Sequence, residues 1–276
     1  MTRLTVRAEL ESMLHGHIPE TLATLPESLR LTRDHADIVA VSGGAGWTHR
    51  ALAGIRSGVR GVMVVNPCIE DARELMSGAD TASVPVALDT SWVHNPAVAA
   101  MAERLRRIAS TGALVESTVT LGADMTDEAA ALAQVTLIHT TVGAIDRVDF
   151  CASDEHGYRA FGHVESGADI AVSGIRTNAY APSARLRVVG HDESVELRVP
   201  SPSTAMPAIA ISADTEAQAV HPTLFESAHR SAWRRLYSAA TAARPIPDLT
   251  LFIEDSVIAV EILSKAATGR QRGGDE

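Results

Sequence analysis

A glycine-rich segment is the first place in the sequence where residue types and spacing suggest chemistry. It contains Ser42, Gly43, Gly44, Gly46 and Trp47, and it separates the apolar run ADIVAV from the helical pattern THRALAGIRSG. Glycines allow the backbone to approach a ligand closely, and the first N–H groups of a helix are free to bind an anion. We expect this segment to cradle a cofactor anion, with a plain strand-to-helix turn as the equal alternative.

Polar residues that could transfer a proton are scattered along the chain. Asp89 and His94 follow a predicted strand, His139 lies in an apolar helical run, and His163 and Arg176 lie in strand-like runs. Carboxylates and imidazoles are common general acids and bases. The plainer interpretations are a capping role for Asp89, a core position for His139, and solvent-facing positions for the two strand residues. Their spacing forms no Ser-His-Asp or Cys-His constellation.

The composition excludes several classes of function. The chain has 276 residues, 46% of them hydrophobic, and a formal charge of −10 with scattered basic residues, which argues against a nucleic-acid partner. We expect neither a membrane span nor a signal peptide, and therefore a cytoplasmic protein. Cys68 and Cys151 have no motif spacing and no zinc pattern occurs, so we expect no metal site.

The elements that must position these residues fall into two groups. Up to about residue 112, short apolar runs alternate with helical patterns; the predicted strands are 4–8, LRLT, 36–41, 60–65 and 84–90. This alternation predicts a mostly parallel sheet covered by helices. The later residues read as a long apolar helix over 127–143 and a series of alternating strands, which predict an antiparallel sheet with one helix-covered face.

We place the domain boundary near residue 112. The first domain, 1–112, is a shortened Rossmann-like domain, and the second, 113–276, is an α+β domain with a mostly antiparallel sheet. Thr126 is positioned to cap the long helix. The last helix, predicted over 255–267, could pack back on the first domain.

Several stretches, taken in order, resemble the Gfo/Idh/MocA (glucose–fructose oxidoreductase/inositol dehydrogenase) family. They are DIVAVSGGAGWTHRALAGIRSGVRGVMVVNP, VPVALDTSWVHNPAVAAMAERL, GHVESGADIAVSGIRTNAYAPSARLRVVGHDESVEL and LFESAHRSAWRRLYSAATAARPIPDLTLFIEDSVIAVEIL. The resemblance implies a Rossmann domain followed by an α+β domain that commonly forms oligomers through its sheet. It would bring Asp89, His94 and His139 near an interdomain site, together with His163 and Arg176.

The chain departs from the family where the dinucleotide pyrophosphate binds. The family's G-x-G-x-x-G turn corresponds to VRAELESMLHGHIP, which has Ala8, Glu9 and Ser12 in place of glycines. Glu9 and Glu11 would place negative charge beside a pyrophosphate. The chain also runs from LRLT almost directly into ADIVAV, so the second βα unit and the third strand are missing.

The chain also departs from the family in its acid–base residues. The lysine of the family's E-K-P motif is replaced by Asn66, which has no ionisable proton, and Lys265 near the C-terminus is the sole lysine. The helix that carries an Asp-x-x-x-His pair in the family has Ala129 and Ala133 in the corresponding region. By this resemblance Asn66, Asp89, His94 and His139 become the candidate site residues.

Three functions follow as hypotheses. The leading one is an oxidoreductase-like protein without a cofactor, a non-redox derivative that forms a homo-oligomer or pairs with a full-length catalytic paralogue, with room for a small-molecule ligand. The second is an atypical NAD(P)-dependent oxidoreductase acting on a sugar, polyol or imine. The third is an enzyme repurposed for elimination or cyclisation, with His139 or Asp89 as its acid–base group. The sequence leaves open which is correct, and whether the protein is an enzyme.

Overall fold

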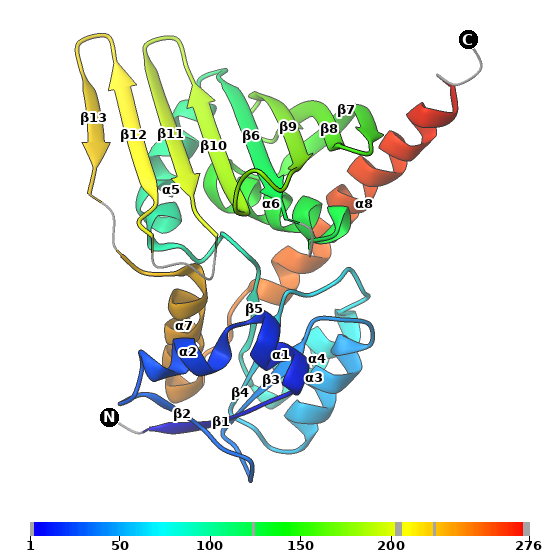
Figure 1. The fold of residues 1–276 in the computed structure, drawn as a ribbon, viewed down its shortest axis with the longest axis vertical. Coiled ribbons are helices and arrows are strands. Elements are labelled where there is room, and N and C mark those ends of the chain that lie inside the picture. The colour runs from blue at the N-terminus through cyan, green and yellow to red at the C-terminus, as the bar shows by residue number, and fades with distance from the viewer. Residues whose placement is uncertain (1–2, 123–124, 202–205, 223–224, 273–276) are drawn as a thin grey trace. The chain divides into compact units, whose positions relative to one another are not determined.

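The computed structural model describes residues 3–122, 125–201, 206–222 and 225–272. The chain forms two compact units (Figure 1). Unit 1 comprises Met1–His94 and Ser227–Glu254, and unit 2 comprises Asn95–Glu226 and Asp255–Glu276. The first division therefore falls at His94, whereas we predicted it near residue 112. The difference is helix α5 (Pro96–Ala109), which packs on α6 (Asp127–Val142) and β11 (Glu193–Val199) within unit 2.

Unit 1 is built on a five-stranded parallel sheet with the order β2-β1-β3-β4-β5. Its strands are β1 (Leu4–Ala8), β2 (Leu29–Leu31), β3 (Ile38–Ser42), β4 (Gly61–Val65) and β5 (Val86–Asp89). Its helices are α1 (Leu10–His15), α2 (Ile18–Ala23), α3 (Trp47–Arg56), α4 (Arg73–Ala82), α7 (Ala228–Ala242) and the start of α8 (Asp248–Arg272). A full dinucleotide-binding sheet has the order 3-2-1-4-5-6, so this sheet lacks the outer third strand. The shortened Rossmann-like sheet predicted from the sequence is thus confirmed.

The strand register shows how a whole βα unit can be absent. Val6 of β1 pairs with Leu31, the last residue of β2, on one side and with Ile38, the first residue of β3, on the other. Because β2 ends at the level where β3 begins, the six connecting residues only have to cross β1 and need not return along the sheet. Asp37 fixes this crossing by accepting hydrogen bonds from the Thr5 N–H and hydroxyl, both at 2.8 Å.

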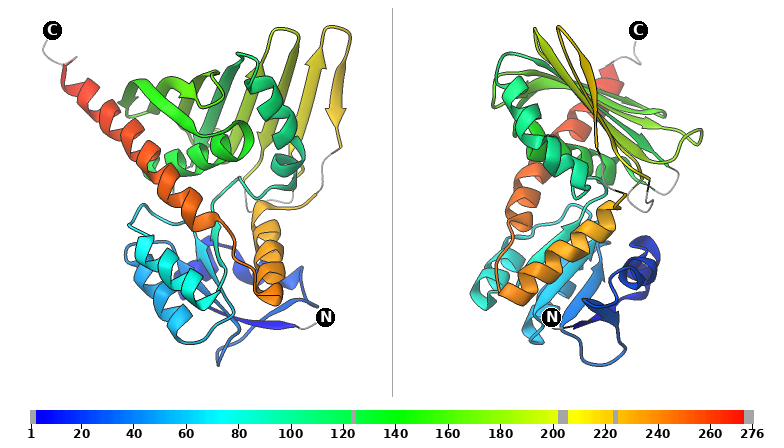
Figure 2. Two further views of the ribbon diagram at one scale, coloured as in Figure 1. Left: turned by 180° about the vertical axis from the view of Figure 1, so that it is seen from behind. Right: turned by 90° about the vertical axis from the view of Figure 1, so that its left-hand side faces the viewer.

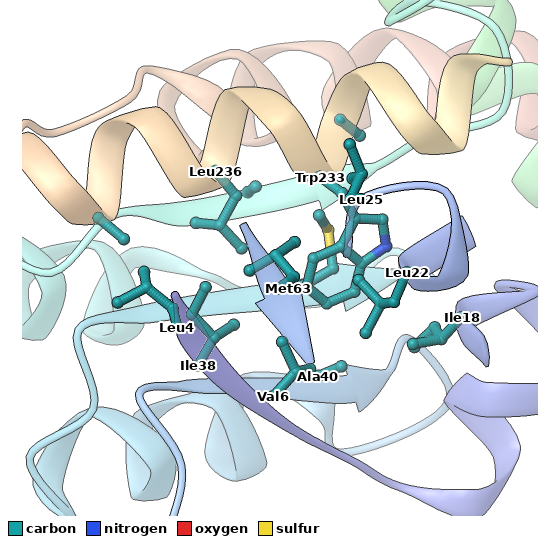
Figure 3. Close-up of a cluster of buried hydrophobic side chains, with 14 of the residues drawn as sticks. Leu4, Val6, Ile18, Leu22, Leu25, Ile38, Ala40, Met63, Trp233 and Leu236 are labelled. Carbon is teal, nitrogen blue, oxygen red and sulfur yellow. The ribbon is translucent and has the colours of Figure 1, made fainter. Parts of the chain in front are cut away.

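The core of unit 1 explains why the central strands are continuously apolar. All residues of β3, β4 and β5 are buried, as expected for parallel strands covered on both faces. On one face, side chains from α2, α7 and the strands converge in a cluster that includes Trp233, Leu236 and Met63 (Figure 3). On the other face, α3 packs on β3, β4 and α4.

Unit 2 is built on an eight-stranded sheet with the order β13-β12-β11-β10-β6-β9-β8-β7. Its remaining strands are β6 (Leu114–Leu121), β7 (Ile145–Asp154), β8 (Gly157–Val164), β9 (Asp169–Arg176), β10 (Ser183–Val189), β12 (Ile209–Asp214) and β13 (Gln218–His221). Among the described residues of this sheet, only the β6–β9 pair is parallel. Helices α5, α6 and α8 lie on one face (Figure 2), so the predicted mostly antiparallel sheet with one helix-covered face is confirmed.

Two details of the helices bear on the sequence predictions. The Thr126 side chain accepts a hydrogen bond from the Ala129 N–H at 3.1 Å, as expected for an N-cap. The last helix begins earlier than predicted, at Asp248, and its first residues belong to unit 1. No helix in the described part of the chain is long and apolar enough to span a membrane.

Candidate functional site

The carboxyl ends of β3, β4 and β5 bring together several of the predicted residues in unit 1. The Asn66 N–H donates to the Asp89 carbonyl at 3.2 Å, and Asn66 is exposed with a left-handed φ of 50°. Gly43 lies directly against it, because a Cβ on Gly43 would stand 2.2 Å from the Asn66 carbonyl oxygen. The glycine at position 43 is therefore required by this close approach of two backbones. Asn66, Asp89 and the glycine-rich segment share one edge of the sheet.

Two carboxylates of the protein itself accept hydrogen bonds from N–H groups of the glycine-rich segment. Glu70 accepts hydrogen bonds from the Gly46 N–H and the Thr48 hydroxyl, the latter at 3.1 Å. Glu9 accepts from the Ser42 N–H at 2.9 Å and forms an ion pair with Arg50. In the structure, the anions that these N–H groups contact are carboxylates of the chain itself. No motif in the sequence indicates Glu70, which lies 24 residues beyond Gly46.

Trp47, predicted to contact a cofactor, lies in the core of unit 1. Its side chain is fully buried, its indole N–H donates to the Cys68 carbonyl at 2.9 Å, and its ring meets Phe252 edge-on at 5.3 Å between centroids. A large aromatic side chain with a satisfied N–H is typical of a core anchor. The ring is not accessible to a ligand.

Asp89 and His229 form a buried pair at the end of β5. The Asp89 carboxylate is wholly buried, and its Oδ2 lies 2.6 Å from Nδ1 of His229, which is 2% exposed. Burial lowers the pKa of His229, but the charge of Asp89 and the hydrogen bond outweigh it, so the pKa is raised. Oδ1 of Asp89 has no hydrogen-bond partner among the described residues. No spacing in the sequence relates the two residues, which stand 140 positions apart.

His94 and His139, the other two predicted acid–base residues, lie in different units. His94 Nε2 is 2.8 Å from the Leu88 carbonyl oxygen, so its ring folds back on the end of β5 in unit 1. His139 belongs to α6 in unit 2, and its Nδ1 is 2.7 Å from Oδ1 of Asp255 on α8. The structure therefore groups Asn66, Asp89 and His94 in one unit and places His139 in the other.

The remaining candidates form ion pairs within unit 2. His163 lies between two carboxylates, at 3.0 Å from Asp149 and 2.9 Å from Asp169. Arg176 pairs with Asp127 at 2.6 Å. The sole lysine, Lys265, donates to the Val148 carbonyl at 2.7 Å and pairs with Glu261. None of the described residues form a group of three or more histidine, cysteine or acidic side chains suited to a metal ion.

A groove of about 620 Å³ lies at the carboxyl ends of β1 and β2. Arg7 and Ala8 of β1, Thr32 and Arg33 after β2, and the apolar side chains of Leu10, Met13 and Leu31 line it. Both arginines are exposed, and so are Leu10 and Leu31, at 69% and 41%. In Rossmann folds this end of the sheet meets the adenosine ribose, and an arginine after the second strand accommodates the 2′-phosphate of NADP.

The sequence matches no family model and no curated protein sequence. Solved structures of the same fold do exist. An oxidoreductase from Sinorhizobium meliloti has a TM-score of 0.76 at 10% identity, covering 98% of this chain and 99% of that one. KijD10, a 3-ketoreductase from Actinomadura kijaniata in complex with NADP and TDP-benzene, has a TM-score of 0.74 at 10% identity, covering 96% and 98%. UDP-N-acetylglucosamine 3-dehydrogenase GnnA from Acidithiobacillus ferrooxidans has a TM-score of 0.69 at 12% identity, covering 96% and 98%.

These neighbours are oxidoreductases of the Gfo/Idh/MocA type, and at such low identity they show the fold alone. They correct one expectation. We expected no cofactor, but KijD10 was solved with NADP, so nucleotide cofactor binding belongs to this fold and the expectation was wrong. The expectation rested on the pyrophosphate turn alone. A dinucleotide also contacts other parts of the carboxyl edge of a parallel sheet, so the loss of that turn does not exclude binding.

Proposed function

We propose that this chain is an oxidoreductase-type protein that binds an NADP-type nucleotide on unit 1 and lacks the family's lysine-assisted chemistry. In this proposal it is a non-redox derivative that works as a subunit beside a catalytic paralogue. The groove at β1 and β2 is the observation that carries the nucleotide part. The uncharged Asn66, at the end of β4, supports the absence of lysine chemistry.

The groove fits the adenosine end of NADP. Arg7 and Arg33 supply two positive charges for the 2′-phosphate, and guanidinium groups suit phosphate oxygens. The Thr32 hydroxyl already accepts from the Asp34 N–H at 3.2 Å and can still donate to a ribose oxygen. Leu10 and Met13 supply apolar surface for an adenine ring.

The turn between β1 and α1 does not fit a pyrophosphate in the family's manner. Helix α1 has six residues, Glu9 stands at its N-cap position, and Glu11 lies in its first turn. The Glu9 carboxylate is held by the Ser42 N–H and by Arg50. Two carboxylates close to the helix start would repel a pyrophosphate. The nucleotide would therefore be bound mainly by its adenosine 2′-phosphate.

In this proposal, the partner subunit binds to exposed apolar side chains on the open face of the sheet in unit 2. Phe150 on β7 and Phe161 on β8 are 54% and 50% exposed, and their ring centroids are 6.1 Å apart. Ile175 on β9 is 45% exposed. The alternation of β8 and β9 turns Phe161 and Ile175 away from the helix-covered face. Size-exclusion chromatography with light scattering, alone and with a full-length paralogue, tests this part.

The nucleotide part is tested by calorimetric titration with NADPH. We expect a Kd of about 1–100 μM, weakened roughly ten- to hundredfold in Arg33→Ala, because a charged hydrogen bond contributes about 1.5–3 kcal/mol. Arg30→Ala is the matched control, since Arg30 is exposed on β2 outside the groove lining. Equal weakening by both substitutions, or no heat with NADPH at about 1 mM, contradicts the proposal.

A second candidate, an atypical NADP-dependent oxidoreductase acting on a sugar, polyol or imine, is favoured by the pair of Asp89 and His229. An acid–base pair at the end of β5 lies one strand from Asn66, the position that resembles the family's lysine. The test follows NADPH consumption with keto-sugars, polyols in the reverse direction, and imines. Turnover that His229→Gln abolishes, with NADPH binding retained, supports this candidate; no turnover with any of them leaves the subunit role standing.

A further inference from the structure

We propose that His17, His229 and Asp89 form a proton relay from solvent to the carboxyl edge of β4 and β5. The relay deepens the second candidate function, on which its purpose rests. It would supply the proton transfer that Asn66 does not. All three residues belong to unit 1.

The inner end of the relay is a buried histidine–aspartate pair that the fold does not need for packing. Helix α7 is already anchored on the sheet by Trp233 and Leu236, and Arg235 pairs with Asp248, which accepts from the Leu88 N–H. A buried ion pair adds little stability compared with apolar residues of similar volume. His229 is also the second residue of α7, where a positive charge opposes the helix dipole. Such a pair therefore points to a use beyond packing.

Asp89 retains the capacity to accept a proton. Its Oδ2 is engaged by His229, while Oδ1 is buried and has no hydrogen-bond partner among the described residues. An unsatisfied carboxylate oxygen in a wholly buried position is costly, so its persistence needs a reason. The main chain of Asp89 also receives the Asn66 N–H at 3.2 Å, which ties the inner end to the edge of β4.

His17 supplies the outer end. Its ring centroid lies 6.3 Å from that of His229 at an interplanar angle of 34°, and its side chain is exposed. In the proposed relay, a water molecule bridges the two rings. His17 is held in the left-handed conformation, with φ of 45°, which is strained for a residue with a Cβ.

The backbone beside His17 is fixed against the end of β4. A Cβ on Gly16 would stand 3.0 Å and 3.1 Å from the two γ-carbons of Val65 and 2.9 Å from the Ser12 carbonyl oxygen. The Gly16 N–H also donates to that carbonyl at 2.9 Å. The connection between α1 and α2 is therefore packed tightly against the residue that precedes Asn66. This packing fixes the backbone position from which the His17 side chain extends.

The relay transfers protons without a change in electrons. The step begins with His229 neutral, so that Nδ1 carries its proton and Nε2 is free. A hydronium ion in the solvent then gives a proton through His17 to Nε2 and becomes water, while the Nδ1 proton moves to the Asp89 carboxylate, which becomes a carboxylic acid. Reversal returns Asp89 to the carboxylate and releases one proton to water. Imidazole suits this task because it can accept at one nitrogen while it donates from the other.

The test measures solvent exchange of the His229 ring N–H protons by ¹⁵N NMR on the full chain. We expect exchange to slow about tenfold or more in His17→Asn, which keeps the left-handed backbone, and added imidazole to restore it. His17→Gly, which adopts this φ without strain, should behave in the same way. His49→Asn, an exposed position on α3, is the control and should change nothing.

Unchanged exchange overturns the relay, and so does faster exchange, which would mean that His17 merely covers His229. Titration of the same variants with NADPH reports separately on the proposed function, because His17 does not line the groove. Slowed exchange with normal NADPH binding supports the relay. Slowed exchange without NADPH binding supports the relay and contradicts the nucleotide proposal.

Discussion

Among the described residues, each unit contains one histidine–aspartate pair between elements far apart in sequence, and the two pairs differ in burial. His229 and Asp89 join α7 to β5 in unit 1, with side chains 2% and 0% exposed. His139 and Asp255 join α6 to α8 in unit 2, with the histidine 21% exposed. The distances are almost equal, at 2.6 Å and 2.7 Å.

A short contact distance alone therefore does not indicate whether such a pair has a structural or a chemical role. The pair in unit 2 ties two helices and leaves its histidine accessible to water, which screens its charge. The pair in unit 1 is shielded from water, so removing one partner leaves an isolated charge in the core. A pair in which both side chains are buried, at the edge of a parallel sheet, is the better candidate for chemistry.

The largest expected effect comes from breaking the buried pair. Asp89→Ala should lower the free energy of unfolding by about 3–5 kcal/mol, because the His229 imidazole loses its buried partner. Urea denaturation followed by circular dichroism measures this. A loss below about 1 kcal/mol would show that water reaches the pair.

Removing the charge while retaining a hydrogen bond separates the stability of the buried pair from its proton transfer. In the double variant Asp89→Asn with His229→Gln, two neutral amides can still meet, so we expect a loss of only about 1–2 kcal/mol relative to the wild type. Any activity attributed to the relay should disappear, since neither amide titrates. A stable double variant that keeps full activity would assign the pair a structural role.

The matching change in unit 2 should cost less. His139→Ala is expected to lower the free energy of unfolding by roughly 1–2 kcal/mol. The loss is small because water can partly solvate the Asp255 carboxylate once the imidazole is removed. The same denaturation experiment compares it with His229→Ala. Equal losses would remove the distinction drawn between the two pairs.

The smallest effect is a dependence of stability on pH. The pKa of His229 is raised by Asp89, so its stabilising contribution is complete below about pH 6.5 and is lost as the pH rises through the raised value. The difference in Tm between the wild type and His229→Gln should therefore be larger at about pH 6 than at about pH 9. A difference that grows as the pH rises would mean that the imidazole is buried in its neutral form.

The sequence predicted the fold well because its signals were local or periodic. The apolar runs over 36–41, 60–65 and 84–90 became β3, β4 and β5, and the short link after LRLT indicated the missing strand. The staggered register that makes this link possible could not be predicted, since pairing of Val6 with both Leu31 and Ile38 is a tertiary property.

The site was only partly predictable, because several of its contacts join residues that are far apart in the sequence. Asp89 and Asn66 could be placed at strand ends, but nothing local indicated that His229 of α7 would contact Asp89 of β5. Glu70 was likewise missed, because carboxylates that cap a distant turn carry no motif. Trp47 was predicted to contact a ligand because it follows the glycines. In the structure it is buried and packs against Phe252.

The central claim is that unit 1 binds a nucleotide by its adenosine 2′-phosphate and not through the pyrophosphate turn. Calorimetric titration with NADPH and with adenosine 2′,5′-bisphosphate tests it most directly. We predict Kd values within about threefold of each other, because the groove contacts are common to both ligands. Binding of NADPH about a hundredfold tighter than the bisphosphate would mean that the turn holding Glu9 does bind pyrophosphate, and would contradict the claim.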